Sequence, residues 1–249
     1  MQDPNCRCCE CAKRIEALEK LADELRRRIA RLDASDAGGA IWPGDSFNYL
    51  AIGNSLTVHE ICRYWWNVVG MAASDAAHDF FHLVRNGLEK RFGEVTARAI
   101  GFSEWELAGH DRDQTFPAVD KLLDERLSLV TVQLGENVVD AGTIAEDYVS
   151  LLEHIKSRTG GAQIVVVGDF WRDDAVRSDA ARKCGVDFVT LADMRDKPEY
   201  RSRIGAVVFD AEGKEHVVEH SGVAKHPGDA GMAAIAERIL KQVRLPQKG

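Results

Sequence analysis

The sequence lacks both a long apolar run and an excess of basic residues. No stretch of the 249 residues is apolar over the length of a transmembrane helix, and the opening MQDPNCRCC has no apolar signal core. The 32 Lys and Arg stand against 40 Asp and Glu, which gives a formal net charge of −8. An acidic chain disfavours a protein that follows nucleic-acid phosphates or lies on an anionic membrane. We therefore expect no nucleic-acid partner and no membrane partner, and either a cytoplasmic location or a place in a larger assembly.

Cysteine is scarce outside one cluster near the start of the chain. Only Cys62 and Cys184 lie elsewhere, whereas a secreted disulfide fold would spread its cysteines along the sequence. These two are expected to be small buried hydrophobic residues. The cluster contains two overlapping CxxC spacings formed by Cys6, Cys8, Cys9 and Cys11. A zinc site within one chain needs two separated pairs, so the alternatives are crosslinks or a shared metal between chains, and an unstructured end.

Residues 13–33 have the pattern of a separate helix. Apolar residues alternate by three and four, as in a heptad seam: Ile15, Leu18, Ala22, Leu25, Ile29 and Leu32. Such a helix either packs on its own domain or associates with copies of itself as a coiled coil. The polar, glycine-containing stretch 33–39 resembles a linker and favours the second alternative. The sequence thus predicts a coiled-coil segment over 1–38, a globular domain over 39–249, and a homo-oligomer formed through 13–33.

From Ser46 onward, short β-rich runs alternate with helical patterns, and no internal repeat is visible. The predicted strands span 47–53, 95–101, 127–135, 162–168 and 186–191. The predicted helices span 57–73, 76–92, 116–126, 142–158, 173–184 and 229–243. This alternation predicts an α/β fold with a doubly wound, mostly parallel sheet of the flavodoxin-like kind. A hairpin with Gly213 in its turn is expected over 206–220.

Three loops at predicted strand ends carry groups suited to acyl transfer, because ligands of parallel sheets bind at the carboxyl ends of the strands. Ser55 follows the first strand as a candidate nucleophile, although, taken alone, an ordinary helix N-cap is the simpler explanation. Asn137 follows the third strand as a candidate oxyanion donor, or simply as a turn residue. His226 precedes the last helix as a candidate general base, or as an exposed loop histidine.

Taken together, these loops resemble the motifs of the SGNH (GDSL-type) hydrolases over about residues 46–244. The matching blocks are Gly53-Asn54-Ser55-Leu56, Gly135-Glu136-Asn137, and His226-Pro227 with Gly231, Ala234, Ile235 and Ala236. The resemblance implies a three-layer sandwich and ester hydrolysis through an acyl-enzyme, without metal or other cofactor. It also implies Ser55 as nucleophile, His226 as base, and an oxyanion site formed by Asn137 with the backbone of Ser55 and Gly101.

The sequence departs from that family pattern at three places. Asn54 stands where Asp is usual, and Val223 stands where the family has the acid partner of the histidine. The partner of His226 is therefore open among a backbone carbonyl or water, Glu219 and Asp229. The usual glycine block after the second strand reads GFSEWE, so the further oxyanion N–H comes from Gly101 or from a neighbour such as Ser103.

Tryptophans give the main indication of the substrate. Trp105 and Trp171 are predicted in loops after strands and are candidates for lining the site, together with Asn54 and Glu136. The Trp65-Trp66 pair is predicted in a helix and in the core.

The leading hypothesis is a serine esterase that removes an acyl group, with acetyl as the expected group, from an ester of a small or carbohydrate substrate. The competing hypotheses are a non-catalytic carbohydrate- or ligand-binding module on the same fold, and a flavodoxin-like nucleotide binder, which the GNSLT turn fits only weakly. Labelling of Ser55 by a fluorophosphonate separates the first hypothesis from the other two.

Overall fold

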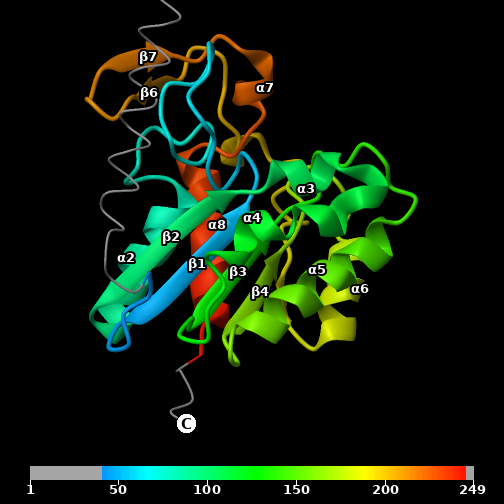
Figure 1. Ribbon diagram of the computed structural model, residues 1–249. Coiled ribbons are helices and arrows are strands. Elements are labelled where there is room, and N and C mark those ends of the chain that lie inside the picture. Colours follow the sequence, from blue (N-terminus) through cyan, green and yellow to red (C-terminus); the bar gives the residue numbers. More distant parts are fainter. Residues whose placement is uncertain (1–40, 245–249) are drawn as a thin grey trace, which may run out of the picture. The chain divides into compact units, whose positions relative to one another are not determined.

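A five-stranded parallel sheet forms the centre of the computed structural model, which describes residues 41–244 (Figure 1). Its strands are β1 (Phe47–Gly53), β2 (Val95–Gly101), β3 (Leu129–Gln133), β4 (Gln163–Val167) and β5 (Asp187–Val189). They lie in the order β2-β1-β3-β4-β5, and every neighbouring pair is parallel. The predicted α/β class with a mostly parallel sheet is confirmed. The order reverses between β1 and β3, which is where ligands bind in sheets of this kind.

Helices cover both faces of the sheet, because side chains alternate along each strand and the core needs apolar cover on either side (Figure 1). On β1, Tyr49 and Ala51 point to one face and Leu50 and Ile52 to the other, and all four are fully buried. Helices α2 (Phe80–Phe92) and α8 (Asp229–Gln242) pack together on the first face. Helices α5 (Ile144–Arg158) and α6 (Ala175–Cys184) pack together on the second.

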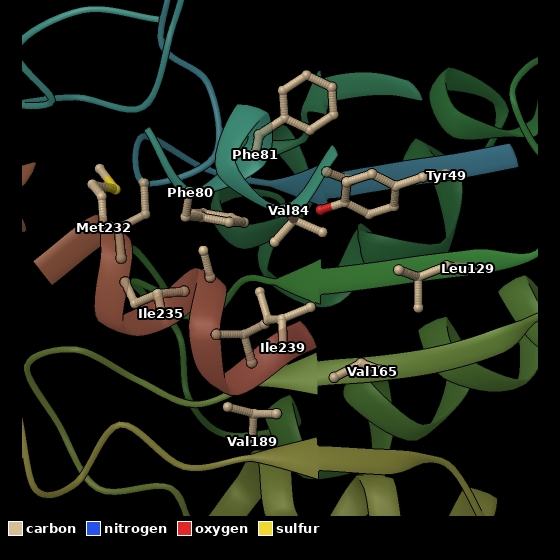
Figure 2. Close-up of a cluster of buried hydrophobic side chains, with 14 of the residues drawn as sticks. Tyr49, Phe80, Phe81, Val84, Leu129, Val165, Val189, Met232, Ile235 and Ile239 are labelled. Atoms are coloured by element: carbon tan, nitrogen blue, oxygen red, sulfur yellow. The ribbon is translucent and has the colours of Figure 1, made fainter. Parts of the chain in front are cut away.

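The core between the sheet and helices α2 and α8 is a cluster of buried apolar side chains (Figure 2). Its members come from four strands, two helices and the loops between them, and include Tyr49, Leu129, Val165, Val189, Phe80, Val84, Met232, Ile235 and Ile239. These helices were predicted at 76–92 and 229–243, which agrees with α2 and α8 to within a few residues. Their apolar spacing was therefore enough to locate them. The 142–158 and 173–184 predictions likewise match α5 and α6.

The prediction of a helix over 57–73 is wrong. This segment is irregular, and its backbone bonds reach other parts of the chain, as when Met71 N donates to Ser55 O at 2.7 Å and His59 N to Val69 O at 3.0 Å. Aromatic and β-branched residues dominate it, and these are weak helix formers. The helix predicted over 116–126 also shrinks, to the four residues of α4 (Pro117–Asp120). The other short helices are α3 (Ser103–Leu107), η1 (Gly109–Thr115), η2 (Pro198–Tyr200) and α7 (Ser221–Ala224).

The irregular segment joins the predicted hairpin in a second, smaller packing unit, which we call the small lobe and define as residues 57–79 and 204–226. Its hairpin consists of β6 (Val207–Phe209) and β7 (Glu215–Val217), and Gly213 in the turn has a φ of +80°. Its core is a separate apolar cluster of Trp65, Val69, Met71, Ala72, Val208, Val218 and Val223. Trp65 is therefore buried as predicted, but it is held by tertiary packing and not by a helix.

The segment before residue 41 carries several predictions that stay untested. The coiled coil over 13–33, the oligomer that it would form, the cysteine cluster and the 1–38 boundary all lie outside the described residues. Of the two remaining cysteines, Cys184 is buried and Cys62 is half-buried, and both are free thiols. Within residues 41–244, no helix combines the length and apolar character that crossing a bilayer requires.

Candidate active site

Ser55 lies in the turn that follows β1, at the carboxyl edge of the sheet. The chain tightens here because Thr57 N and Val58 N both donate to Asn54 O, at 2.9 and 3.0 Å. Gly53 makes this turn possible, since a Cβ at that position would lie 1.9 Å from the Thr57 hydroxyl oxygen and 2.9 Å from Gln133 O. The backbone N–H of Ser55 donates to no atom of the described residues. The turn thus presents a hydroxyl and a free N–H to the same space.

His226 reaches Ser55 from the small lobe. Its Nε2 lies 2.9 Å from Ser55 Oγ, and its Nδ1 lies 2.8 Å from the carbonyl oxygen of Gly222. Because a carbonyl can only accept, Nδ1 must carry the proton, and Nε2 is left as the acceptor for the serine hydroxyl. The structure therefore brings together a serine and a histidine in the tautomer that a general base requires.

A backbone carbonyl is thus the partner of His226, which was one of the alternatives left open by the sequence. Glu219 is exposed and forms no hydrogen bond or ion pair with His226, and Asp229 instead accepts from Ser74 N at 2.7 Å. Val223 is buried in the small lobe. Within residues 41–244 the pair has no carboxylate behind it, so its geometry is that of a dyad.

Burial holds the pKa of His226 at about 4, well below its usual range. The Gly222 carbonyl acts in the opposite direction, while the nearby His59 and His220 lower the pKa further. With no carboxylate to stabilise the imidazolium, the ring is neutral at neutral pH. A neutral ring is the form that can take the serine proton.

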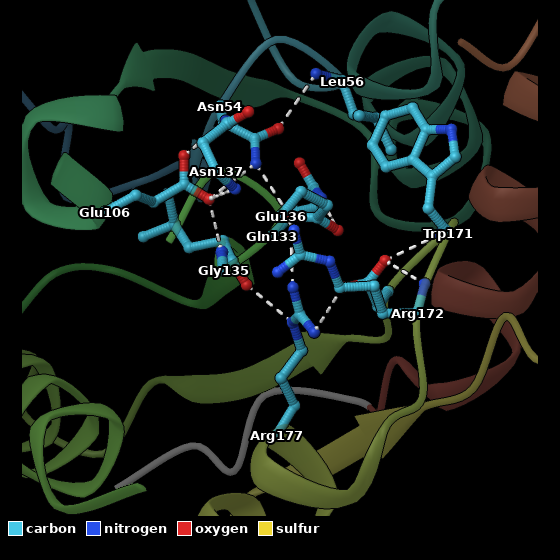
Figure 3. A network of polar contacts seen from close by, with 12 residues as sticks. Asn54, Leu56, Glu106, Gln133, Gly135, Glu136, Asn137, Trp171, Arg172 and Arg177 are labelled. Atoms are coloured by element: carbon cyan, nitrogen blue, oxygen red, sulfur yellow. Dashed lines mark hydrogen bonds and ion pairs between the residues drawn. The ribbon is translucent and has the colours of Figure 1, made fainter. Parts of the chain in front are cut away.

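Asn137 is held in place by a buried carboxylate, that of Glu106 on α3 (Figure 3). Glu106 accepts from the Asn137 side-chain amide at 2.7 Å, from Asn137 N at 3.2 Å and from Gly135 N at 2.5 Å. Gly135 has a φ of +113°, which favours glycine in this turn. The Asn137 amide uses one hydrogen on Glu106, and its second has no acceptor among the described residues. That hydrogen is available to a ligand.

Asn54, a candidate for substrate binding, is instead an internal link. It is fully buried, and its amide nitrogen donates to Glu106 at 3.0 Å and to Glu136 at 2.7 Å (Figure 3). An aspartate at this position would face two carboxylates without a proton to share. The departure from the usual Asp is therefore explained by the two acids that surround this residue.

Glu136 connects this network to the far side of the site. Its carboxylate accepts from Gln133 at 2.7 Å and lies 3.2 Å from the Arg177 guanidinium, which also pairs with Asp169 at 3.0 Å. Burial raises the pKa of Glu136 to about 7, although Arg177 opposes that shift. Three donors surround this buried carboxylate: Asn54, Gln133 and Arg177.

A cavity of about 300 Å³ opens in front of the Ser55–His226 pair. It is lined by Ser55, Glu136, Asn137, Trp171, Arg172, Gly222, Lys225 and His226. Trp171 meets the His226 ring edge to face at 5.1 Å, and its indole N–H donates to Lys225 O at 3.3 Å. The structure thus places Trp171 and Glu136 at the cavity, where the sequence predicted substrate-binding residues.

Two other predicted site residues lie elsewhere. Trp105 is in helix α3 and not in a loop; it is fully buried, with its ring edge to face with Tyr148 at 5.5 Å, so the expectation that it lines the site is wrong. Gly101 is the register partner of Gly53 at the same sheet edge, but neither it nor Ser103 lines the cavity.

Sequence reasoning missed Glu106, Gly222, Arg172 and Lys225. The only signal for Glu106 was its position in the loop after the second strand, which does not show what its carboxylate contacts.

Comparison with known proteins finds likeness only at the level of structure. No protein-family model matches the chain, and no curated protein matches it. A two-domain esterase active on acetylated mannans superposes with a TM-score of 0.55 and 17% identity, over 90% of this chain and 54% of that one. A catalytic mutant of an acetylxylan esterase from Geobacillus stearothermophilus superposes with a TM-score of 0.50 and 13% identity, over 82% and 96%. The chain spans about half the length of the mannan esterase, and at these identities the likeness establishes the α/β fold.

Proposed function

We propose that the protein is a serine esterase that removes acetyl groups from a carbohydrate through an acyl-enzyme. One observation carries the proposal: Ser55 Oγ lies 2.9 Å from His226 Nε2 while the other ring nitrogen is occupied by a carbonyl. A serine and a correctly oriented base at a cavity form the basic arrangement of nucleophilic acyl transfer. The resemblance to SGNH hydrolases supports the same roles.

In the proposed reaction, Ser55 Oγ attacks the ester carbonyl as its proton passes to His226 Nε2. The negative charge that develops on the carbonyl oxygen is stabilised by the free hydrogen of the Asn137 amide and by the backbone N–H of Ser55. Gly101 is given no role in this reaction, because it does not line the cavity. His226 then protonates the departing sugar hydroxyl, and a water molecule, activated by the same ring, releases acetate from Ser55.

The Gly222 carbonyl orients His226 but carries no full charge. It therefore fixes the tautomer as a triad acid would, while stabilising the imidazolium less. The low pKa of His226 agrees with this weaker support.

The size and walls of the cavity favour a short acyl group on a sugar. At about 300 Å³ it lies at the lower end of ligand sites, which span roughly 300–1,000 Å³. Trp171 offers an aromatic surface against which a sugar ring can pack. Both structural neighbours named above are esterases of acetylated polysaccharides, which agrees with this choice.

A carbohydrate-binding module without catalysis is the second candidate. Within the described residues no carboxylate lies behind His226, and this favours the binding module. A missing triad acid weakens catalysis but does not prevent the cavity from binding a sugar. Asn137 and the free Ser55 N–H, both suited to an oxyanion, favour the enzyme.

The decisive experiment is covalent labelling of the protein with a fluorophosphonate, alongside acetate release from acetylated xylan and mannan. We expect label on Ser55 alone and loss of both label and acetate release in Ser55→Ala. Ser157→Ala is the matched control, since that hydroxyl hydrogen-bonds only with His154 and Arg158 of its own helix among the described residues. Acetate release by Ser55→Ala at the unmodified rate would contradict the proposal.

A further inference from the structure

Two basic side chains line the cavity without an acidic partner. Arg172 and Lys225 are both exposed, and neither forms an ion pair within residues 41–244. Nearby arginines behave differently, since Arg177 pairs with Asp169 at 3.0 Å and Arg195 with Asp174 at 3.0 Å. In a chain with a net charge of −8, unpaired cations at the mouth of the candidate active site need an explanation.

The acid at this cavity does not balance them. Glu136 is the one acidic residue of the lining, and its carboxylate is already bound by Asn54, Gln133 and Arg177. Figure 3 shows the Arg172 side chain extending toward Glu136, but no ion pair joins the two. Since His226 is neutral at neutral pH, the lining carries two cations, Arg172 and Lys225, against this one acid.

The two cations line the same cavity as the aromatic side chain of Trp171. Arg172 follows Trp171 in the chain, and Lys225 accepts the Trp171 indole N–H on its carbonyl oxygen at 3.3 Å. A sugar ring packed on Trp171 would thus share the cavity with both cations. Guanidinium and ammonium groups bind carboxylates through charge-assisted hydrogen bonds, and positive clefts concentrate anionic ligands.

We propose, on the basis of the proposed esterase function, that the substrate is an acetylated sugar that carries a carboxylate, a uronic acid residue of an acidic polysaccharide. Arg172 and Lys225 bind its carboxylate while its acetylated hydroxyl lies at Ser55. The reaction consumes one water and yields acetate and the uronate with a free hydroxyl.

The test compares the full chain on three kinds of substrate, after hydrolysis of 4-nitrophenyl acetate has shown that the protein is an esterase. These are acetylated polygalacturonate, neutral acetylated xylan and a sulfated acetylated polysaccharide. We expect kcat/KM on the polygalacturonate to exceed that on xylan by about tenfold or more, and the ratio to fall as salt is added, because exposed charges are screened.

Substitutions assign this preference to the two cations. Arg172→Gln and Lys225→Gln should each lower the ratio of kcat/KM on polygalacturonate to that on xylan by about fivefold, mainly through KM, and Lys225→Glu should lower it further. Lys90→Gln is the matched control, since it removes the same charge from the end of α2 and should leave the ratio unchanged.

The failures can be told apart. Hydrolysis of 4-nitrophenyl acetate with equal kcat/KM on acidic and neutral polysaccharides would overturn the carboxylate proposal and leave the esterase intact. Preference for the sulfated substrate would overturn the assignment to a uronic acid. No hydrolysis of any ester, with Ser55 unlabelled, would overturn the proposed function itself.

Discussion

The parallel sheet and the small lobe contribute the two halves of the candidate site in different ways. Ser55 and Asn137 directly follow β1 and β3, adjacent strands whose register is set by backbone pairing. His226 follows α7 in a lobe with little regular structure, held by a seven-residue apolar cluster. The nucleophile thus depends on strand register, whereas the base depends on tertiary packing. The 2.9 Å contact between Ser55 Oγ and His226 Nε2 therefore depends on the packing of the small lobe against the sheet.

Backbone hydrogen bonds tie the lobe to its surroundings. Met71 N donates to the carbonyl of Ser55 at 2.7 Å, and Ser202 N donates to the carbonyl of His226 at 2.8 Å. The first bond links the lobe to the residue that carries the nucleophile. Because the lobe has the smaller core, we expect it to open at a lower free energy than the sheet.

The largest effect is expected from the base itself. His226→Ala should lower kcat roughly 10³-fold or more, because no other group can take the serine proton. Glu219→Gln and Asp229→Asn should each cost less than about tenfold, since neither forms a hydrogen bond or ion pair with His226 and a true triad acid costs about 10⁴-fold. Steady-state kinetics at pH 7–8 measure all three. A loss near 10⁴-fold in either carboxylate variant, with the fold retained by circular dichroism, would mean a triad.

On the sheet side, Asn137→Ala should lower kcat by about 10²-fold with little change in KM, because an oxyanion donor acts in the transition state. Glu106→Gln should lower kcat by a smaller factor, about tenfold, since a neutral amide holds Asn137 and Gly135 less firmly than a carboxylate. The matched control is Asn86→Ala on α2, whose side chain hydrogen-bonds only with Arg85 among residues 41–244. A rise in KM at constant kcat would instead mark Asn137 as a residue that binds substrate.

Restoring the aspartate usual in the resembling family at position 54 should harm this protein. Asn54→Asp places a third acid within hydrogen-bond distance of Glu106 and Glu136, and we expect a loss of about 2–4 kcal/mol in the free energy of unfolding. Denaturant titration measures this loss. Adding Glu106→Gln should recover part of it, because the amide and the acid then exchange places. A single variant as stable as the natural chain would show that Asn54 is not needed as a link.

Two matched valine substitutions compare the regions directly. Val132 in β3 and Val218 in the small lobe are both fully buried, and truncation to alanine should cost each about 1–3 kcal/mol. Val132→Ala should lower the global melting temperature and leave kcat near its original value. Val218→Ala should lower kcat and speed hydrogen exchange in the lobe well below the melting temperature. Identical behaviour of the two variants would mean that lobe and sheet unfold as one unit.

The pH profile should show the smallest effect under ordinary conditions. Because His226 is active when neutral and its pKa is about 4, kcat/KM should stay level from pH 8 down to roughly pH 5 and fall below that. A serine–histidine pair with the ordinary histidine pKa, near 6.5, would already lose activity at pH 6. Rates measured between pH 4 and 8 on a neutral ester separate the two cases. A midpoint near 6.5 would mean that His226 is well solvated in the working enzyme.

The regular region was predictable from the sequence, and the irregular region was not. Apolar runs ending in glycine located β1 and β2, since buried parallel strands need continuous apolar character. In residues 57–73 the apolar residues also recur at a helix-like spacing, yet Trp65 and Val69 are buried by the distant Val208 and Val218. A local period cannot show that contact.

The candidate site divides in the same way. Ser55, Asn137 and His226 could be proposed because each follows or precedes a recognisable element. Glu106 could not, because its role comes from contacts with residues about thirty and fifty positions away. Trp105 was misplaced for a related reason: the loop after β2 folds into α3, which turns the indole inward.

The carbonyl behind His226 has a consequence for how this site can change over generations. A main-chain oxygen is present whatever side chain the position encodes, so no single missense substitution deletes it as one would delete an aspartate. Position 223 therefore does not need to supply an acid partner for His226, and its valine packs in the core of the small lobe. Residue 223 therefore helps to place His226 only through packing. Substitutions at this position should be tolerated when they preserve the volume of the side chain, whereas a carboxylate is not required.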